Sequence, residues 1–426
     1  MASIRTAVRA FAEIAAACAG FWAAGCGGAA DPGAEERQDG GAVEIDVDGD
    51  GFGAGLDCDD SDPLAHPGAP DEVALGPWTS TPIAWEVTGG AVGVAVEPGG
   101  ALHAAFRVPE GIRYASRARG EAEWTAATIA GTEDDWLQGF ALDGRGTAHL
   151  AFGQFESVHY AAGGRIGFDV EEIALGDLYL VQFAVDPAGT PHLLLEDPEV
   201  SLIVSTRSEG TWSQERVDME GATGHALALA YDDESEPHIV LADSRGPISH
   251  VHRGVGGWAA ESVAEVPPHL AHFYDPVAID ASRGSLRIAH GWMEYDFEHN
   301  WAGQTAVGVW AGEGGAWQES VTLDPALAYR CLSVRTGEDD SIHLLWGGYR
   351  DLFYATDARG GGWILERLSA DFSESTACAL AVGAGNVAHV LYGRVTADPL
   401  VQAELVYITN GVAEDWIDED CDGFDG

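Results

Sequence analysis

The chain has 426 residues, enough for one large all-β domain or two ordinary domains, and its hydrophobic content of 46% is that of a globular protein with a core. It carries 69 acidic residues against 21 basic ones, all of them arginine, which gives a formal net charge of -48. This charge repels phosphates and anionic membrane surfaces, so we expect no nucleic-acid partner.

The first residues predict export. Arg5 and Arg9 accompany an apolar run over residues 10–24, which is too short for a transmembrane helix. The following Ala23-Ala24-Gly25-Cys26 resembles the cleavage box of bacterial lipoproteins, although Ala23 stands where leucine is usual. The resemblance implies a signal peptide over 1–26, lipidation of Cys26, and membrane contact only through that lipid. Ordinary signal cleavage, with secretion, is the alternative to an outer-membrane or cell-surface lipoprotein. Residues 27–45 predict a flexible tether.

A calcium-type loop follows the tether. Asp46, Asp48 and Asp50 alternate, so their carboxylates can converge on one cation, while Gly51 stands sixth, where such a loop turns sharply. Phe52, at the seventh position, offers a backbone carbonyl, and Asp57, at the twelfth position, closes the loop. Calcium is the expected ion, and an unstructured acidic linker is the alternative. The other acidic residues assigned to this motif are Asp59, Asp60, Asp62, Asp418, Asp420 and Asp422.

The acidic motif is divided between the two ends of the chain. Residues 57–70 read DCDDSDPLAHPGAP, and residues 420–423 read DCDG. Together they resemble the metal-binding motif of bacterial surface proteins, whose repeats run DxDGDG, DCDD-x-DP, PGA, a short spacer and DCDG. The resemblance implies that 46–72 and 412–426 are halves of one calcium motif, that a domain is inserted in the spacer, and that Cys58 pairs with Cys421.

A repeat fills the region between these halves. One unit, over 140–164, reads FALDGRGTAHLAFGQFESVHYAAGG, and its pattern of four short strands joined by Asp/Gly turns recurs seven times. Seven such units predict an all-β fold, a seven-bladed β-propeller of four-stranded blades over 76–411. We expect the repeated tryptophans to pack, and each marker histidine to bond a backbone group at its turn. The markers are His103, His149, His192, His238, His343 and His389, with Arg287 in the slot of one further unit.

The last unit lacks its fourth strand. It begins at Cys378 and ends near Asn410 without the Trp-Glu strand seen elsewhere, whereas residues 78–87, WTSTPIAWEV, supply such a strand before the first unit. We therefore expect the N-terminal strand to complete the last blade, which removes exposed sheet edges and brings residue 76 close to residue 411. The divided acidic motif requires the same proximity and would lie at the base of the ring.

The repeat also loosely resembles the sialidase-type and fucose-lectin-type propellers of secreted bacterial proteins. The sialidase Asp-box is not met, since its nearest match, STRSEGTW over 205–212, has Arg207 at the Asp position. By count alone, four cysteines beyond the signal allow three pairings. Cys331 and Cys378 begin neighbouring inner strands, and a bridge or a pair of buried thiols are both open, because adjacent inner strands can be too far apart for a disulfide.

The loops that enter the inner strands carry the candidate ligand-binding residues. Propeller geometry gathers these loops on one face around the channel, where aromatic rings and carboxylates suit a glycan or a protein segment. The alternative is that these side chains plug the channel mouth. The residues assigned to binding are Trp136, Tyr179, Phe273, Tyr274 and Tyr329. An insertion over 292–303 in the fifth unit is either a partner contact or a hairpin extension.

No catalytic motif stands out. The chain has no nucleophile elbow, His-Glu-x-x-His, P-loop or dinucleotide-binding glycine motif. The leading hypothesis is a non-enzymatic, calcium-stabilised, monomeric surface lipoprotein whose propeller binds a glycan or protein. The alternatives are a secreted glycan-processing hydrolase and a structural envelope protein with no soluble ligand.

Overall fold

The computed structural model describes residues 75–411 with short internal gaps. The gaps are 85–86, 89, 155–156, 174–177, 198–200, 218–225, 243–246, 255, 265–269, 272–276, 297–300, 314–315, 324–330, 349, 358–361, 374–377 and 397–402. Cys26, both halves of the predicted calcium motif and its two cysteines, Cys58 and Cys421, lie outside the described residues. In the described part of the chain, no helix is both long and apolar enough to cross a membrane.

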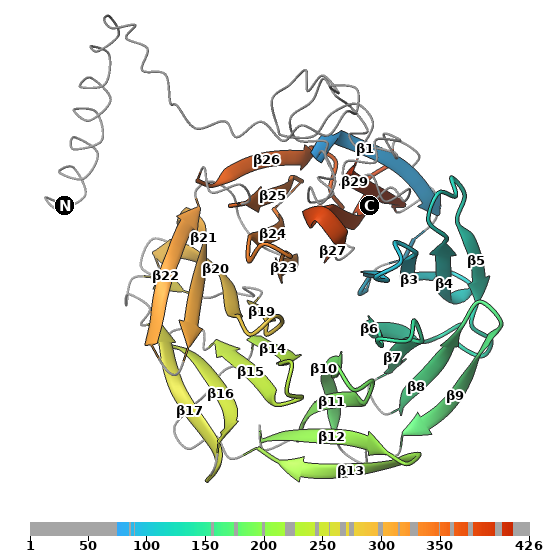
Figure 1. The fold of residues 1–426 in the computed structure, drawn as a ribbon, viewed down its shortest axis with the longest axis horizontal. Coiled ribbons are helices and arrows are strands. Elements are labelled where there is room, and N and C mark those ends of the chain that lie inside the picture. The colour runs from blue at the N-terminus through green and yellow to red at the C-terminus, as the bar shows by residue number, and fades with distance from the viewer. Residues whose placement is uncertain are drawn as a thin grey trace, which may run out of the picture. The chain divides into compact units, whose positions relative to one another are not determined.

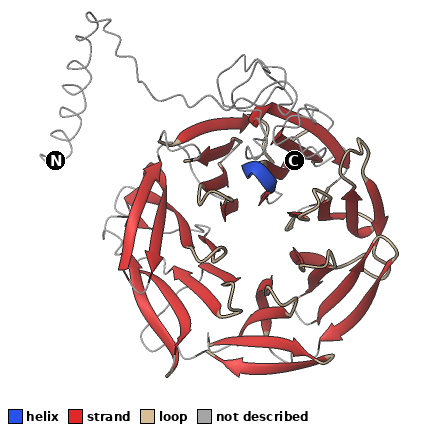
Figure 2. Cartoon of the chain, viewed as in Figure 1, coloured by secondary structure: helices blue, strands red, loops and turns tan. Residues whose placement is uncertain are grey.

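Seven antiparallel sheets stand in a ring, which confirms the predicted seven-bladed propeller (Figures 1 and 2). Blade 1 consists of β2 (Gly93–Val96), β3 (Leu102–Val108), β4 (Gly111–Arg117) and β5 (Thr125–Thr128). Blade 2 consists of β6 (Trp136–Leu142), β7 (Ala148–Gln154), β8 (Ser157–Gly164) and β9 (Gly167–Ile173). Blade 3 consists of β10 (Tyr179–Val185), β11 (Pro191–Glu196), β12 (Leu202–Ser208) and β13 (Thr211–Arg216). In each of these blades the first strand lies nearest the ring centre and the fourth lies outermost (Figure 1).

Blades 4 to 7 follow the same order. Blade 4 consists of β14 (Ala226–Tyr231), β15 (Pro237–Ala242), β16 (Ile248–Gly254) and β17 (Gly257–Ala264). Blade 5 consists of β18 (Leu270–Ala271), β19 (Val277–Asp280), β20 (Leu286–Asp296), β21 (Trp301–Glu313) and β22 (Ala316–Leu323), and blade 6 of β23 (Cys331–Thr336), β24 (Ile342–Gly347), β25 (Leu352–Thr356) and β26 (Ile364–Ser369). Blade 7 consists of β27 (Cys378–Val382), β28 (Ala388–Arg394), β29 (Glu404–Gly411) and β1 (Leu75–Ala84). A short 3-10 helix, η2 (Ala384–Asn386), lies between β27 and β28.

Blade 5 departs from the pattern in two ways. Two short strands, β18 and β19, share its inner edge by pairing with different parts of β20. The predicted insertion lengthens the β20–β21 hairpin, where Asp296 pairs with Trp301. The described part of the insertion therefore forms a hairpin extension, and whether it contacts a partner stays a prediction.

The Asp/Gly turns set the register between the first two strands of a blade. In blade 2 the side-chain Oδ1 of Asp143 accepts hydrogen bonds from the backbone N–H groups of Arg145 and Thr147, at 2.9 and 2.8 Å. Gly146 has a φ of 78°, a left-handed conformation that costs glycine little. The motif DGRGT thus folds into a tight hairpin by local hydrogen bonding alone.

The core lies between blades, because each second strand is covered on both faces by its neighbours. Leu150, Leu194 and Leu344 are fully buried, and each such side chain stabilises the fold by about 1.5–3 kcal/mol. One apolar cluster joins Leu391 and Leu405 of blade 7 to Phe106 of blade 1, so the core is continuous across the point where the ring closes.

The ring closes through the N-terminal strand, as the sequence predicts. β1 pairs antiparallel with β29, with Thr81 opposite Tyr407 and Leu75 opposite Gly411. The chain therefore enters and leaves the propeller at neighbouring positions on one blade.

A disulfide joins blades 6 and 7. Cys331 begins β23, Cys378 begins β27, and the two inner strands place their Cα atoms 5.6 Å apart, within the range that a disulfide spans. The bridge resolves the choice between a disulfide and buried thiols that the sequence leaves open.

Candidate functional site

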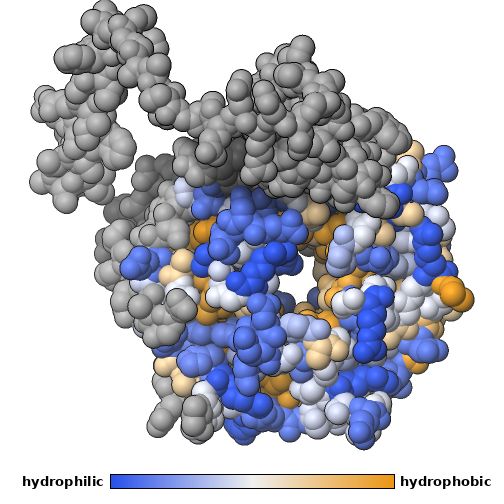
Figure 3. Space-filling model, in the orientation of Figure 1, coloured by the Kyte–Doolittle hydropathy of each residue, from blue (hydrophilic) through white to orange (hydrophobic). Residues whose placement is uncertain are grey.

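Five residues are predicted to bind a ligand, and Trp136 is the one among them whose side chain the structure describes. This residue begins β6, and Tyr179 begins the equivalent strand β10, although the Tyr179 side chain lies outside the description. Phe273, Tyr274 and Tyr329 also lie outside the described residues, so a shared aromatic pocket stays a prediction. The space-filling view shows an opening at the centre of the ring, with hydrophilic residues over much of the surrounding face (Figure 3).

Trp136 is an exposed aromatic ring held from one side. Its side chain is 43% exposed, and the guanidinium carbon of Arg107 lies 4.4 Å from the ring centroid. Arg107 is fixed in turn by hydrogen bonds from Nε to the carbonyl of Asp135, at 2.7 Å, and from Nη1 to the hydroxyl of Thr88, at 2.9 Å. An added Cβ at Gly90 would come within 3.3 Å of the indole, so the absence of a side chain there makes room for the ring.

A carboxyl group and an imidazole lie beside this tryptophan. Asp135 is buried, and its Oδ2 lies 3.7 Å from Nδ1 of His159, whose ring stacks on Phe152 at 5.5 Å. Burial raises the pKa of Asp135, while the neighbouring histidine opposes that shift. At the boundary of blades 1 and 2, Arg107 thus links the exposed indole to the backbone of Asp135, whose carboxyl group faces His159. Such a group can hydrogen-bond hydroxyls and stack on an apolar ring face.

The marker histidines are structural, but the partner expected for them is wrong. The imidazole Nδ1 of each bonds a side chain rather than a backbone group. In four blades the partner is a tyrosine of the third strand, which stands opposite the residue two positions after the histidine and projects toward its ring. The four bonds to tyrosine hydroxyls join His103 to Tyr114, His149 to Tyr160, His343 to Tyr354 and His389 to Tyr407, at 2.5–2.7 Å. In blade 3, His192 bonds the hydroxyl of Thr206 at 2.9 Å.

The other imidazole nitrogen faces an acidic residue of the turn in four blades. Burial lowers the pKa of all six markers, to about 4 for His343 and His389, so these rings are neutral near pH 7. A neutral imidazole can donate to the turn carboxylate and accept from the tyrosine hydroxyl. The pairs with the acidic residues are His103 with Glu97, His149 with Asp143, His192 with Asp186 and His238 with Asp232, at 2.8–3.5 Å.

The repeated tryptophans do more than pack. The indole Nε1 of Trp212, in the outer strand of blade 3, donates to Glu171 in the outer strand of blade 2 at 2.8 Å, and its ring meets Tyr160 edge-on. Three further bonds repeat this Trp–Glu contact between neighbouring blades. They run from Trp258 to Glu215, from Trp317 to Glu261 and from Trp78 of the closing strand to Glu366.

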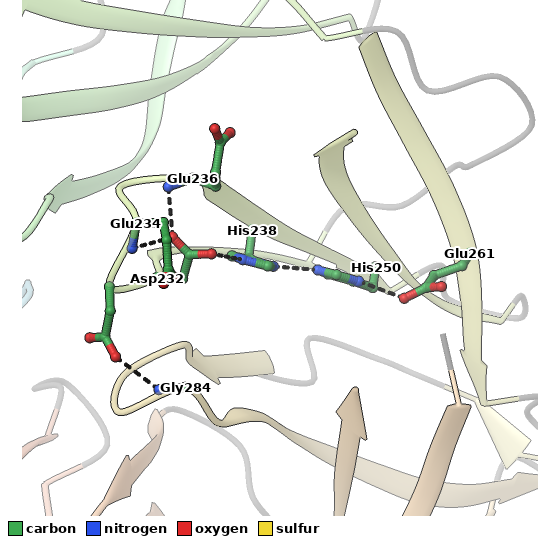
Figure 4. Close-up of polar contacts among 8 residues, drawn as sticks. Asp232, Glu234, Glu236, His238, His250, Glu261 and Gly284 are labelled. Atoms are coloured by element: carbon green, nitrogen blue, oxygen red, sulfur yellow. Dashed lines mark hydrogen bonds and ion pairs between the residues drawn. The ribbon is translucent and has the colours of Figure 1, made fainter. Parts of the chain in front are cut away.

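Blade 4 replaces the tyrosine of this pattern with a second histidine. Nδ1 of His238 lies 2.9 Å from Nε2 of His250, whose Nδ1 lies 2.9 Å from Oε1 of Glu261 (Figure 4). At the other end, Nε2 of His238 faces Asp232 at 3.3 Å. The result is a carboxylate–imidazole–imidazole–carboxylate chain across the blade. His250 is buried, which lowers its pKa to about 4.

A third imidazole extends this group. The ring of His252 stacks on that of His250, with centroids 5.1 Å apart and planes inclined by 12°. One possible ligand atom from each of His250, His252 and Glu261 lies within 4.8 Å of the others. The cluster was not predicted from the sequence, although the run His250-Val251-His252 in place of the usual Tyr-Ala was visible there.

No protein-family model matches the chain, and no curated protein matches it in sequence. Among solved structures, the polysaccharide lyase Uly1 is similar at a TM-score of 0.50 and 10% identity, over 76% of this chain and 90% of that one. AofleA from Arthrobotrys oligospora matches at a TM-score of 0.41 and 12% identity, over 79% and 90% of the two chains. The six-bladed lectin of Aleuria aurantia matches at 0.42 and 11%, over 67% and 98%. At these identities the likeness shows the propeller fold alone.

Proposed function

We propose that this propeller is a binding module for a glycan and that Trp136 is at the centre of the binding surface. The observation that carries the proposal is an indole that is 43% exposed, whereas every other aromatic side chain that the structure describes is buried or half-buried. An exposed aromatic beside convergent polar groups is typical of a ligand site rather than of packing.

The surroundings of Trp136 favour a sugar over an apolar ligand. Arg107 fixes one side of the indole, while Asp135 and His159 offer a carboxylate and an imidazole nearby. A sugar ring has an apolar face for the indole and hydroxyls for the polar groups. The ligand class is also carried over, as part of this proposal, from the polysaccharide lyase that shares the fold.

The proposal extends to the ends of the chain. Leu75 pairs with Gly411, so the two described ends of the chain, next to residues 46–72 and 412–426 in sequence, lie opposite each other on one blade. This supports a calcium motif assembled from both halves, with Cys58 bridged to Cys421 and Cys26 as a lipid anchor for an exported protein. In this proposal calcium stabilises the base of the ring and takes no part in ligand contact.

A glycan array probed with calcium present tests the binding function. We expect the full-length protein to bind a subset of glycans and Trp136→Ala to lose that signal at least tenfold. Val170→Ala, which removes an exposed apolar side chain from the outer strand of the same blade, is the matched control and should bind as the parent does. Equal loss in both variants, or no binding to any glycan or protein tested, would favour a purely structural envelope role.

A glycan-processing hydrolase is the second candidate, favoured by one observation. Asp135 is buried next to the exposed tryptophan, and burial raises its pKa, as a general acid requires. Chromogenic glycosides test this directly. Turnover that disappears in Asp135→Asn but persists in Val170→Ala would replace the binding function with an enzymatic one.

A further inference from the structure

Among the described residues, two of the four carboxylates in the inter-blade Trp–Glu series bind an arginine, and Glu261 and Glu366 do not. Glu171 is bonded by Arg207 and Glu215 by Arg253, and each arginine comes from the third strand of the following blade. Arg207 stands opposite Trp212 in its ladder, and the residue opposite Trp317 is Gly312. Glycine therefore stands at the arginine position next to Glu261, whereas Glu171 and Glu215 each bind a guanidinium.

Imidazoles gather around the same carboxylate. His250 stands directly opposite Glu261 in the ladder, at the position that holds tyrosine in four other blades. His252 stands opposite His238, at a position that holds Ser116, Ala162 or a threonine in the other blades with a marker histidine. Both departures from the repeat add a nitrogen donor beside Glu261, and no other blade carries either one among the residues that the structure describes.

The hydrogen bonds of this chain need one positive charge beyond two neutral imidazoles and two carboxylates. The links Asp232–His238, His238–His250 and His250–Glu261 need three protons between them. Two neutral imidazoles carry only two protons, and ionised carboxylates carry none. One further proton on the chain, or a cation at one end of it, satisfies the third link; otherwise two nitrogen lone pairs, or a nitrogen and a carboxylate, face each other away from water.

We propose that His250, His252 and Glu261 bind a divalent transition-metal ion of the zinc or copper class. Two imidazole nitrogens with one carboxylate oxygen suit these ions, whereas calcium prefers oxygen ligands alone. With a cation on Nδ1 of His250, its Nε2–H donates to His238, and His238 donates to Asp232, so two neutral imidazoles satisfy both remaining links. Asp232 and His238 then orient the ligand as an outer shell, and Trp317 holds Glu261.

The same ion supplies the positive charge that arginine gives to Glu171 and Glu215. It lies at the contact between blades 4 and 5, because Trp317 of blade 5 both donates to Glu261 at 3.0 Å and packs edge-on against His250 at 5.3 Å. The proposed site uses none of the residues of the acidic calcium motif and does not depend on glycan binding.

The internal repeat provides the test variant. The double substitution His250→Tyr, His252→Thr restores the residues that most other blades carry and removes both nitrogen donors. Zn²⁺ is titrated calorimetrically into chelator-stripped, full-length protein in excess calcium, which occupies acidic oxygen sites. We expect the parent to bind one zinc ion that the double variant binds about 100-fold more weakly or not at all. His159→Gln, which removes an imidazole beside a carboxylate in blade 2, should bind as the parent does.

A second variant and a spectroscopic readout make the result decisive. His252→Thr alone leaves the buried relay in place, so it tests the site even if the double variant unfolds. Bound Cu²⁺ should show nitrogen hyperfine coupling in its electron paramagnetic resonance spectrum in the parent, reduced in His252→Thr. Equal zinc affinity in the parent and His252→Thr, or copper coupled to oxygen only, would overturn the proposal.

Discussion

The marker histidines predict that acid destabilises the propeller in a defined pH range, and His343 isolates the effect. This imidazole is fully buried between the hydroxyls of Ser341, at 2.9 Å, and Tyr354, at 2.6 Å. Burial lowers its pKa from 6.5 to about 4, against the opposing charge of Asp339. Between these values the unfolded chain binds a proton at this position and the folded chain does not, so the free energy of unfolding falls as the pH falls.

The size of the effect follows from the two pKa values. From pH 7 to pH 5, the preferential protonation of an unfolded His343 removes about 2 kcal/mol from the free energy of unfolding. The loss begins near pH 6.5 and is complete near pH 4. Other buried histidines add to it, while protonation of the surplus carboxylates relieves their mutual repulsion and opposes it. The total slope of the parent protein therefore does not measure one residue.

A comparison with His343→Gln separates this contribution from the rest. Glutamine keeps a donor and an acceptor but does not titrate, so its cost at pH 7 is a constant offset. Urea unfolding of both proteins at several pH values between 7 and 5 should show the parent losing about 2 kcal/mol more than the variant. Parallel curves for the two proteins would mean that His343 is not buried as a neutral imidazole, and the reasoning would fail.

Three further predictions concern the contacts that hold the ring together. Trp212→Phe keeps an aromatic ring but removes the bond to Glu171, and should lower the free energy of unfolding in urea by about 1 kcal/mol beyond the packing that the smaller ring loses. Phe168→Leu is the control: Phe168 stands at the tryptophan position and Ala127 at the glutamate position, so this variant should lose packing alone. Replacing Cys331 and Cys378 by alanine opens a crosslink across a sequence separation of 47, and should cost about 4 kcal/mol in the chain-entropy model; an unchanged melting temperature would contradict the bridge. Calcium should protect residues 46–75 from protease, and cleavage at the same rate with and without calcium would count against the predicted motif.

The sequence alone predicts the propeller because the repeat is visible without any tertiary knowledge. The turn residues mark the strands, and the surplus strand at Trp78 matches the strand that the unit beginning at Cys378 lacks. The pairing of β1 with β29 confirms that interpretation. Ring closure was predictable since only one position in the ring can accept the extra strand.

The contacts between blades were harder to predict, because they depend on distances that no single repeat contains. The Cys331–Cys378 bridge needs the separation of two inner strands, and the Trp–Glu bonds need the offset between two outer strands. Some signals were available. Tyrosine follows the marker by 11 residues in His103, His149 and His343, which indicates a partner two positions along the ladder.

Departures from the repeat separate structural adaptation from function. Ala127 stands where other blades have the outer-strand glutamate, and Phe168 of the next blade stands where its tryptophan partner would be, so one loss is matched by the other. The structure explains this pair by packing alone, since the Phe168 ring meets Tyr114 edge-on. In blade 4, by contrast, Glu261 is retained while its arginine position holds Gly312.

That departure is filled by donors rather than by apolar groups. If blade 4 had adapted only for packing, an apolar residue would stand at its tyrosine position, as Val204 stands opposite Glu215 in blade 3. Instead the carboxylate stays, and His250 and His252 both turn toward it. A retained charge with new nitrogen neighbours is the arrangement that a bound cation stabilises. Two nitrogen donors beside a retained carboxylate are why the zinc titration of His252→Thr addresses function and the Phe168 substitution addresses stability.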